Sequence, residues 1–130
     1  MDGYLLDTNA FTMALTGDTR LPEKALERMQ AADRLAVSVI SFYEIGQKVR
    51  LGKWPEMAPH VDKLENQARS DGYDLIPLTA KAALMASTLD WLHRDPFDRM
   101  IAAVAMIETL PLISSDTAFD GLAVERIWGS

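Results

Sequence analysis

The chain has 130 residues, contains no cysteine and carries a formal net charge of −6, from 13 basic and 19 acidic side chains. Without cysteine, a disulfide framework and thiolate metal sites are excluded. The negative charge argues against a protein that coats nucleic acid by bulk charge, although an enzyme can still bind nucleic acid locally. No apolar run reaches the roughly 18 residues of a membrane span, and no basic segment typical of a secretion signal opens the sequence. We therefore expect a cytoplasmic protein, no membrane contact and one domain over residues 1–130.

Short apolar runs alternate with segments of helical periodicity along the whole chain. The helices are bounded by residues that commonly cap or stop them, such as Ser41 and Thr79 at the start and Gly17 and Gly52 at the end. In chain order, the expected elements are a strand at 3–6, a helix at 10–15, a helix from 22 onward, a strand at 35–40, a helix at 41–51, a helix through 57–71, a strand at 73–78, a helix at 79–93, a helix at 96–110, and strands at 112–115 and 122–128.

This alternation predicts an α/β fold. Strands joined through helices form right-handed crossovers, which give a twisted, mostly parallel sheet covered by helices on both faces. The helix expected at 96–110 is apolar around most of its circumference, so we expect it to lie against the sheet.

Four carboxylates stand where strands end or helices begin. Asp7 ends the first strand, and Asp116 follows the strand at 112–115. Glu44 lies in the first turn of the helix that is expected after the second strand. Ligands of an open parallel sheet bind beyond the carboxyl ends of its strands. If the helix that carries Asp98 enters from the same edge, all four carboxylates converge there.

Helix capping is the alternative explanation for each of these acids. Ser41 and Glu44 have the spacing of a capping box, and Asp95 and Asp98 mimic one, while an aspartate after a strand can be an N-cap. A helix cap stabilises the fold by only about 0.5–2 kcal/mol. Two like charges about 4 Å apart destabilise it by about 4 kcal/mol at an effective dielectric of about 20. A divalent cation would offset that repulsion. Oxygen ligands favour Mg²⁺ or Mn²⁺, which assist phosphodiester hydrolysis.

Taken together, the motifs resemble PIN-domain ribonucleases, most of all the VapC toxins of bacterial and archaeal toxin–antitoxin pairs. The matching stretches are LLDTNAF at 5–11, SVISFYEIGQKVRLGK at 38–53, HRDPFDRMIAA at 93–103 and LISSDTAFD at 112–120. The resemblance implies a PIN-like fold and an acidic quartet that holds Mg²⁺ or Mn²⁺, made of Asp7, Glu44, Asp98 and Asp116. It also implies that Thr8 and Asn9 help to orient the quartet, and it leaves Asp95 as a helix cap. The partners it implies are an RNA substrate, an antitoxin that blocks the acidic site, and a second copy in a homodimer.

Several basic residues allow both a functional and a structural interpretation. Lys48, Arg50 and Lys53 are either a rim that grips phosphate or cations at a helix C-terminus. Arg99 either contacts substrate or pairs with a neighbouring acid.

Aromatic residues and histidines carry less functional weight. Trp54 and Trp91 are more typical of packing than of stacking on RNA bases. We expect neither His60 nor His93 to be catalytic, because a metal-bound water removes the need for a histidine base. His93 is expected to end a helix, where an imidazole suits the helix dipole.

Two other functions fit parts of the pattern. The first is a PIN-type module that has lost activity and docks RNA or protein, which the presence of all four acids disfavours. The second is another carboxylate–Mg²⁺ enzyme of the phosphatase type, but a nucleophilic aspartate there usually has a second acid two residues away, and Asp7 is followed by Thr8 and Asn9. The leading hypothesis is a Mg²⁺-dependent endoribonuclease that acts as a toxin.

Overall fold

The computed structural model describes residues 2–129. The strands are β1 (Gly3–Leu6), β2 (Arg34–Ser38), β3 (Asp74–Ile76), β4 (Leu112–Ile113) and β5 (Arg126–Ile127). The α-helices are α1 (Thr8–Thr16), α2 (Glu23–Ala31), α3 (Val39–Arg50), α4 (Leu64–Ser70), α5 (Ala80–Thr88) and α6 (Pro96–Glu108). The 3-10 helices are η1 (Pro55–Lys63) and η2 (Thr117–Gly121). None of the helices within this range is long and apolar enough to cross a membrane.

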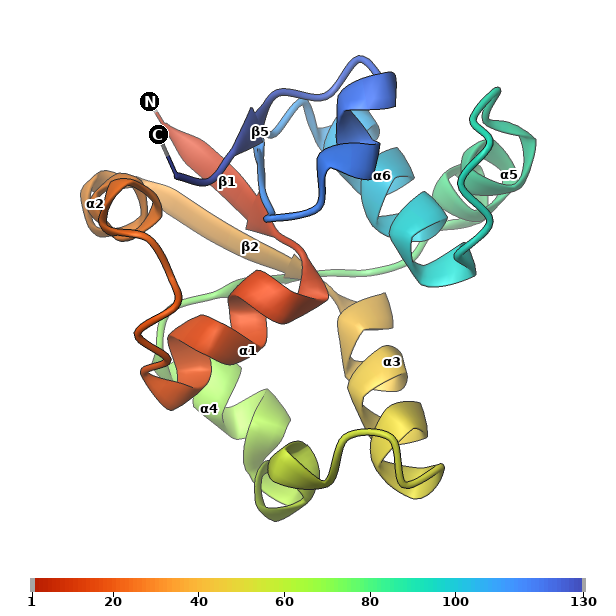
Figure 1. Cartoon of the computed structure of the whole chain (residues 1–130). Coiled ribbons are helices and arrows are strands. Elements are labelled where there is room, and N and C mark those ends of the chain that lie inside the picture. Colours follow the sequence, from red (N-terminus) through yellow and green to blue (C-terminus); the bar gives the residue numbers. More distant parts are fainter. Residues whose placement is uncertain (1, 130) are drawn as a thin grey trace.

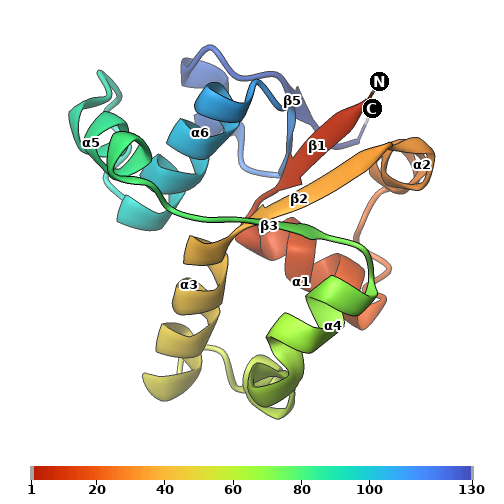
Figure 2. The same ribbon diagram turned by 180° about the vertical axis from the view of Figure 1, so that it is seen from behind.

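The strands form one sheet in the order β3-β2-β1-β4-β5, and each neighbouring pair is parallel. β1 is central: Leu5 is paired with Ala36 of β2 on one side and with Leu112 of β4 on the other. The neighbouring strands β3, β2 and β1 can be followed in the view from behind (Figure 2). Because the strands run in the same direction, the segments that leave β1, β2 and β4 emerge at one edge. The predicted parallel α/β sheet is confirmed.

Helices cover both faces of the sheet, as predicted. Successive side chains of a strand point to opposite faces, and in β1 Leu6 packs into one buried cluster while Leu5 packs into the other. The first cluster takes its partners from α1, α2, α3, η1 and α4, including the fully buried Phe11. The second is formed with α6 and η2, including Ile101 and Phe119. These two groups of helices lie on opposite sides of β1 and β2 (Figure 1).

Two predicted boundaries are wrong in ways that affect the site. β2 ends at Ser38 rather than at residue 40, because the Ser38 side chain accepts a hydrogen bond from the backbone of Ile40 and caps α3. The helix expected to reach His93 ends at Thr88, so residues 89–94 are not helical. No glycine marks that end, and the contacts that hold it come from α6.

The remaining differences lie at other element ends. The helix expected through 57–71 is divided into η1 and α4, with Pro59 inside the 3-10 helix. The predicted strands at 73–78, 112–115 and 122–128 are shorter, at Asp74–Ile76, Leu112–Ile113 and Arg126–Ile127. Neither change moves an acidic residue away from the predicted edge.

Candidate metal centre

Asp7 is the buried carboxylate at this edge, at the junction of β1 and α1. It is the N-cap of α1, and its Oδ1 accepts a 2.8 Å hydrogen bond from the backbone N–H of Ala10. Its Oδ2 accepts a hydrogen bond from the Ser114 hydroxyl. Burial raises the pKa of Asp7 to about 6, although both hydrogen bonds lower it, and the negative charges of Asp98 and Glu44 raise it further. An ionised Asp7 is therefore costly to the fold, and a nearby cation would reduce that cost.

Glu44 comes from the second turn of α3, not from the first turn as predicted. Since Ser38 is the N-cap, the capping-box interpretation of Ser41 and Glu44 is wrong. Instead, the Thr8 hydroxyl lies 2.6 Å from Glu44 Oε1 and 2.9 Å from the Ser41 hydroxyl. The Lys48 ammonium donates to Glu44 Oε2 at 2.5 Å. Glu44 is thus buried, and both of its carboxylate oxygens have a partner. It does not cap α3 but contacts Thr8 of α1.

Asp98 enters from the first turn of α6, where Asp95 performs the capping. Asp95 Oδ1 accepts from the backbone N–H groups of Phe97, at 2.8 Å, and of Asp98, at 3.4 Å. The Asp98 carboxylate is turned away from the cap and lies 2.7 Å from Nε2 of His93. Burial raises the pKa of Asp98, while the hydrogen bond from His93 lowers it.

Asp116 follows β4 and is the N-cap of η2. Its Oδ1 accepts a 2.9 Å hydrogen bond from the backbone of Ala118. Its own N–H donates to the Ser114 hydroxyl oxygen at 3.0 Å. Ser114 is therefore a direct link between Asp116 and Asp7.

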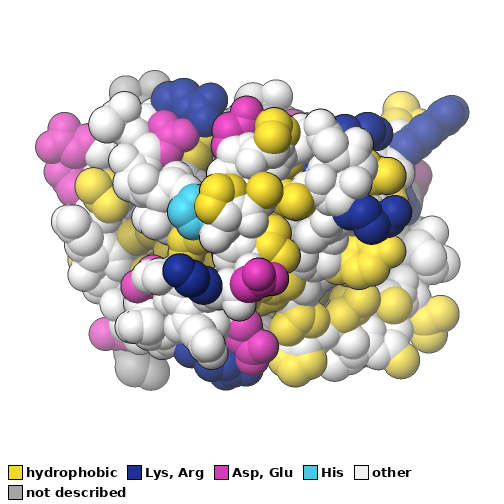
Figure 3. Space-filling model, turned by 90° about the horizontal axis from the view of Figure 1, so that it is seen from below, with side chains coloured by type: hydrophobic (Ala, Val, Ile, Leu, Met, Phe, Trp, Pro, Cys, Tyr) yellow, Lys and Arg dark blue, Asp and Glu magenta, His cyan; other side chains and the backbone are white. Residues whose placement is uncertain are grey.

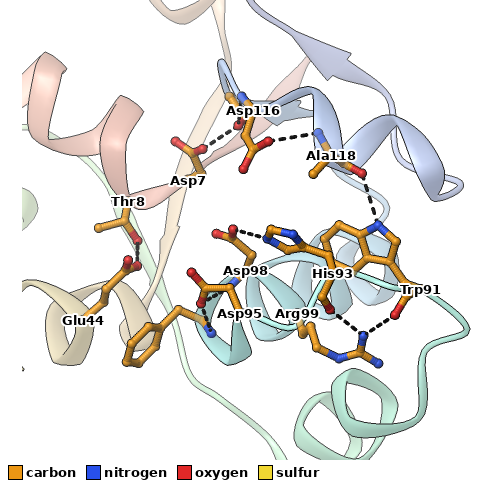
Figure 4. Close-up of polar contacts among 12 residues, drawn as sticks. Asp7, Thr8, Glu44, Trp91, His93, Asp95, Asp98, Arg99, Asp116 and Ala118 are labelled. Atoms are coloured by element: carbon orange, nitrogen blue, oxygen red, sulfur yellow. Dashed lines mark hydrogen bonds and ion pairs between the residues drawn. The ribbon is translucent and has the colours of Figure 1, made fainter.

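The four predicted acids come from four different elements and lie at one edge of the sheet. Ligand atoms of His93, Asp98 and Asp116 all lie within 4.8 Å of one another. The carboxyl groups of Asp7, Asp98 and Asp116 surround one open space, with Glu44 beside Thr8 at its margin (Figure 4). Capping and convergence are not exclusive here, because Asp7 and Asp116 cap helices with one carboxylate oxygen each.

The donor set suits a hard divalent cation. Asp7, Asp98 and Asp116 have no Lys or Arg ion-pair partner within residues 2–129, whereas Glu44 has Lys48. Carboxylate oxygens match Mg²⁺ and Mn²⁺. Within the described residues, positive charge reaches the margin of this space through Lys48 on Glu44 and through Arg126 near Asp116, but neither is paired with Asp7.

The other candidate residues are distributed differently from the prediction. Lys48 is half-buried between Glu44 and the ring of Trp54, 5.6 Å from its centroid, while Arg50 and Lys53 are exposed. Asn9 is exposed and lines a groove of about 650 Å³ that is also lined by His60. The face of the molecule that is seen from below the view of Figure 1 carries basic side chains scattered among acidic and hydrophobic ones (Figure 3).

Arg99 forms no ion pair with an acid among the described residues, so that interpretation of it is wrong, and its guanidinium is turned to backbone carbonyls (Figure 4). Its guanidinium donates four hydrogen bonds of 2.7–2.9 Å, all to backbone carbonyls, namely those of Ala86, Leu89, Trp91 and His93. Arg99 therefore holds the non-helical segment after α5 against the start of α6.

Sequence reasoning missed His93 as a member of the site. It was expected to end a helix, but its ring lies on Asp98. The only local signal was its position five residues before Asp98 in a charged stretch.

The fold and the acidic edge define an α/β protein with a cluster of acidic groups beyond the ends of its parallel strands. The chain belongs to the PIN domain family, which it matches over residues 4–125. The predicted resemblance to PIN-domain proteins is confirmed.

Solved structures with the same fold include chains from toxin–antitoxin complexes. A chain of VapBC2 from Rickettsia felis, bound to a promoter DNA fragment, superimposes with a TM-score of 0.70 and 17% identity over 97% of this chain and 98% of that one. A chain of DNA-bound VapBC from Salmonella typhimurium gives 0.67 and 21% over 99% and 98%. VapBC-5 from Mycobacterium tuberculosis gives 0.63 and 24% over 98% and 99%. A comparison with curated protein sequences gave no match.

Proposed function

We propose that this chain is a metal-dependent endoribonuclease that acts as the toxin of a VapBC-like toxin–antitoxin pair. The observation that carries the proposal is the placement of acids from β1, α3, α6 and the end of β4 at one edge of the sheet, where ligand atoms of Asp98 and Asp116 lie within 4.8 Å of each other and of His93. A buried carboxylate there, Asp7, has a pKa raised to about 6, and no Lys or Arg among the described residues forms an ion pair with it. Such an arrangement fits a divalent cation better than it fits structural capping.

In this proposal Asp7, Asp98 and Asp116 hold Mg²⁺ or Mn²⁺, and Glu44 completes the site. When held there, a divalent ion would supply an activated water and would stabilise the negative charge that develops on the phosphate. The chain's own contacts keep the carboxylates in place: Ser114 joins Asp7 to Asp116, while Thr8 and Lys48 fix Glu44.

The substrate and partners follow from the same site. An RNA backbone would bring its phosphate to the open space, and the exposed Arg50 and Lys53 on the Glu44 side are the proposed contacts for neighbouring phosphates. A cognate antitoxin would block the acidic site, and a second copy would form a homodimer in the cytoplasm. The family match and the shared fold with chains of VapBC complexes support this assignment.

Metal-dependent RNA cleavage is the direct test. Purified protein is expected to cut single-stranded or structured RNA with Mg²⁺ or Mn²⁺ present and to stop when EDTA is added. A chromogenic phosphate monoester should not be hydrolysed under the same conditions. Hydrolysis of the ester without RNA cleavage would instead assign a phosphatase-type enzyme, and cation binding without either activity would assign a silent PIN-type module.

Metal binding is expected to stabilise the fold. At about 10 mM Mg²⁺ and an assumed Kd of about 1 mM, linkage gives about 1.4 kcal/mol, which thermal unfolding can detect. Asp98→Asn should remove this gain and raise the stability of the metal-free protein, because like-charge repulsion falls. The gain should also be smaller near pH 5 than near pH 8, because below its pKa of about 6 Asp7 holds a proton that the cation must displace. An Asp98→Asn variant that keeps the full Mg²⁺ gain would contradict this site.

A further inference from the structure

We propose that His93 is a positioning residue of the metal centre, and that the segment 89–93 is held by Arg99 and Trp91 so that His93 orients Asp98. The inference rests on the proposed function, because it assigns a role within the same cation site. It concerns a residue that sequence reasoning excluded and a segment that was expected to be helical.

The first support is the way the segment is anchored. Arg99 directs donors to the carbonyls of Leu89, Trp91 and His93 as well as to Ala86 near the end of α5. Hydrogen bonds from a charged donor are stronger than those between neutral groups. Because Arg99 directly follows Asp98, the same turn of α6 carries an acid of the site and the group that fixes the segment facing it.

The second support is the aromatic contact that fixes the His93 ring. The rings of Trp91 and His93 have centroids 4.8 Å apart, and Trp91 also packs on the buried Phe119 at 5.6 Å. The indole N–H of Trp91 donates to the Ala118 carbonyl at 3.1 Å, and the Ala118 N–H donates to Asp116. The segment therefore connects the two parts of the chain that carry Asp98 and Asp116, as Figure 4 shows.

The contact between His93 and Asp98 has the geometry of an orienting hydrogen bond. An ionised carboxylate can only accept, so in the 2.7 Å contact with ionised Asp98 it is His93 Nε2 that carries the proton. A protonated Nε2 has no lone pair for a cation, so in this arrangement Nε2 acts on the cation through Asp98 rather than by binding it. With Oδ2 occupied by this donor, Asp98 keeps its other oxygen for the cation. Groups that orient metal ligands in this way typically change metal affinity by roughly tenfold to a hundredfold when removed.

The experiment measures Mn²⁺ affinity directly, by electron paramagnetic resonance titration of the intact protein without RNA. His93→Ala is expected to weaken Mn²⁺ binding by roughly tenfold to a hundredfold. His93→Gln should recover most of that loss, because the glutamine amide nitrogen stands the same number of bonds from the backbone as imidazole Nε2 and can donate to Asp98. The matched control is His60→Ala, which removes the chain's other histidine from the groove beside Asn9 and should leave the affinity unchanged.

The outcomes separate this inference from the proposed function. If the wild-type protein binds no Mn²⁺, or if Asp98→Asn does not weaken binding, the proposed site fails and the inference fails with it. If Asp98→Asn weakens binding but His93→Ala does not, the site stands and the role of His93 is overturned. If the glutamine variant is folded by circular dichroism but binds Mn²⁺ as weakly as the alanine variant, His93 contributes packing only and does not orient Asp98. If pulsed electron paramagnetic resonance detects an imidazole nitrogen bound directly to Mn²⁺, His93 is a metal ligand and the positioning role is overturned.

Discussion

Asp7→Asn is expected to abolish RNA cleavage while making the metal-free protein more stable at neutral pH. Cleavage should fall by at least about a hundredfold, because a cation contributes several kcal/mol to the transition state and each 1.36 kcal/mol is about a tenfold change in rate. The opposite signs of the two effects exclude unfolding as the cause of lost activity. Asparagine has nearly the same shape as aspartate, so the cap on Ala10 can persist.

The gain in stability follows from the raised pKa of Asp7. The carboxyl titrates near 3.8 when unfolded and at about 6 in the fold, so at neutral pH its ionisation opposes folding by about 3 kcal/mol. Replacing it by a neutral amide removes that cost. With the amide oxygen kept on Ala10, however, an NH₂ group stands where Oδ2 accepts from Ser114, so that hydrogen bond is lost, which leaves a net gain of about 1–2 kcal/mol. For this group the penalty is present above pH 6 and disappears as the pH falls to about 4, so the difference between variant and wild type should shrink on acidification.

Urea unfolding in EDTA at several pH values, together with a cleavage assay in Mg²⁺, measures both effects. Asp62→Asn is the matched control, because Asp62 is exposed in η1 and the same substitution there should change neither quantity. Robust cleavage by Asp7→Asn would remove Asp7 from the site. Loss of both stability and cleavage would instead make Asp7 a structural cap only.

The parts of this architecture that could be read from the sequence are those set by local signals. β1 was predicted with its observed bounds, and Asp95 before Pro96 marked the start of α6, because a side-chain cap and a proline act within one turn of chain. The acids at the strand ends could be placed at one edge by a topological rule, because parallel pairing brings the carboxyl ends of all strands to the same edge.

The errors arise where a distant residue decides a local conformation. Ser38 and Ser41 are both suitable caps for α3; Ser38 fills that role, and Ser41 contacts Thr8, 33 residues earlier. The end of α5 depends on a guanidinium from the next helix, so no pattern within residues 80–94 marks it. His93 was missed as a consequence, because its place beside Asp98 exists only when that segment is not helical. Lys48 was interpreted either as a cation at the C-terminus of the helix or as a contact to substrate phosphate. Its ion pair with Glu44, four residues earlier, was overlooked.

Expression of this chain alone is expected to arrest growth, and co-expression with its antitoxin is expected to restore it. The structure suggests how a partner could achieve this. Glu44 already has Lys48, whereas Asp7, Asp98 and Asp116 surround an open space without an arginine or lysine among the described residues paired to them. The rigid, planar guanidinium of an arginine matches carboxylates in such a space and would compete with the divalent cation. A partner segment that becomes ordered on binding would depend heavily on that single anchor.

We therefore expect an arginine in the antitoxin whose replacement by alanine restores both RNA cleavage and toxicity, although much of the remaining interface persists. Cells expressing this chain with either form of the antitoxin can be scored for growth, and the purified complexes can be compared in the cleavage assay. The Asp7→Asn variant expressed alone is the control, and it should be harmless at the same protein level. If wild-type protein at verified levels leaves growth unchanged, while the purified chain still cleaves RNA with Mg²⁺, the toxin role fails and a housekeeping PIN nuclease becomes the better assignment. If the arginine-less antitoxin still blocks cleavage, inhibition occurs through a surface other than the acidic site.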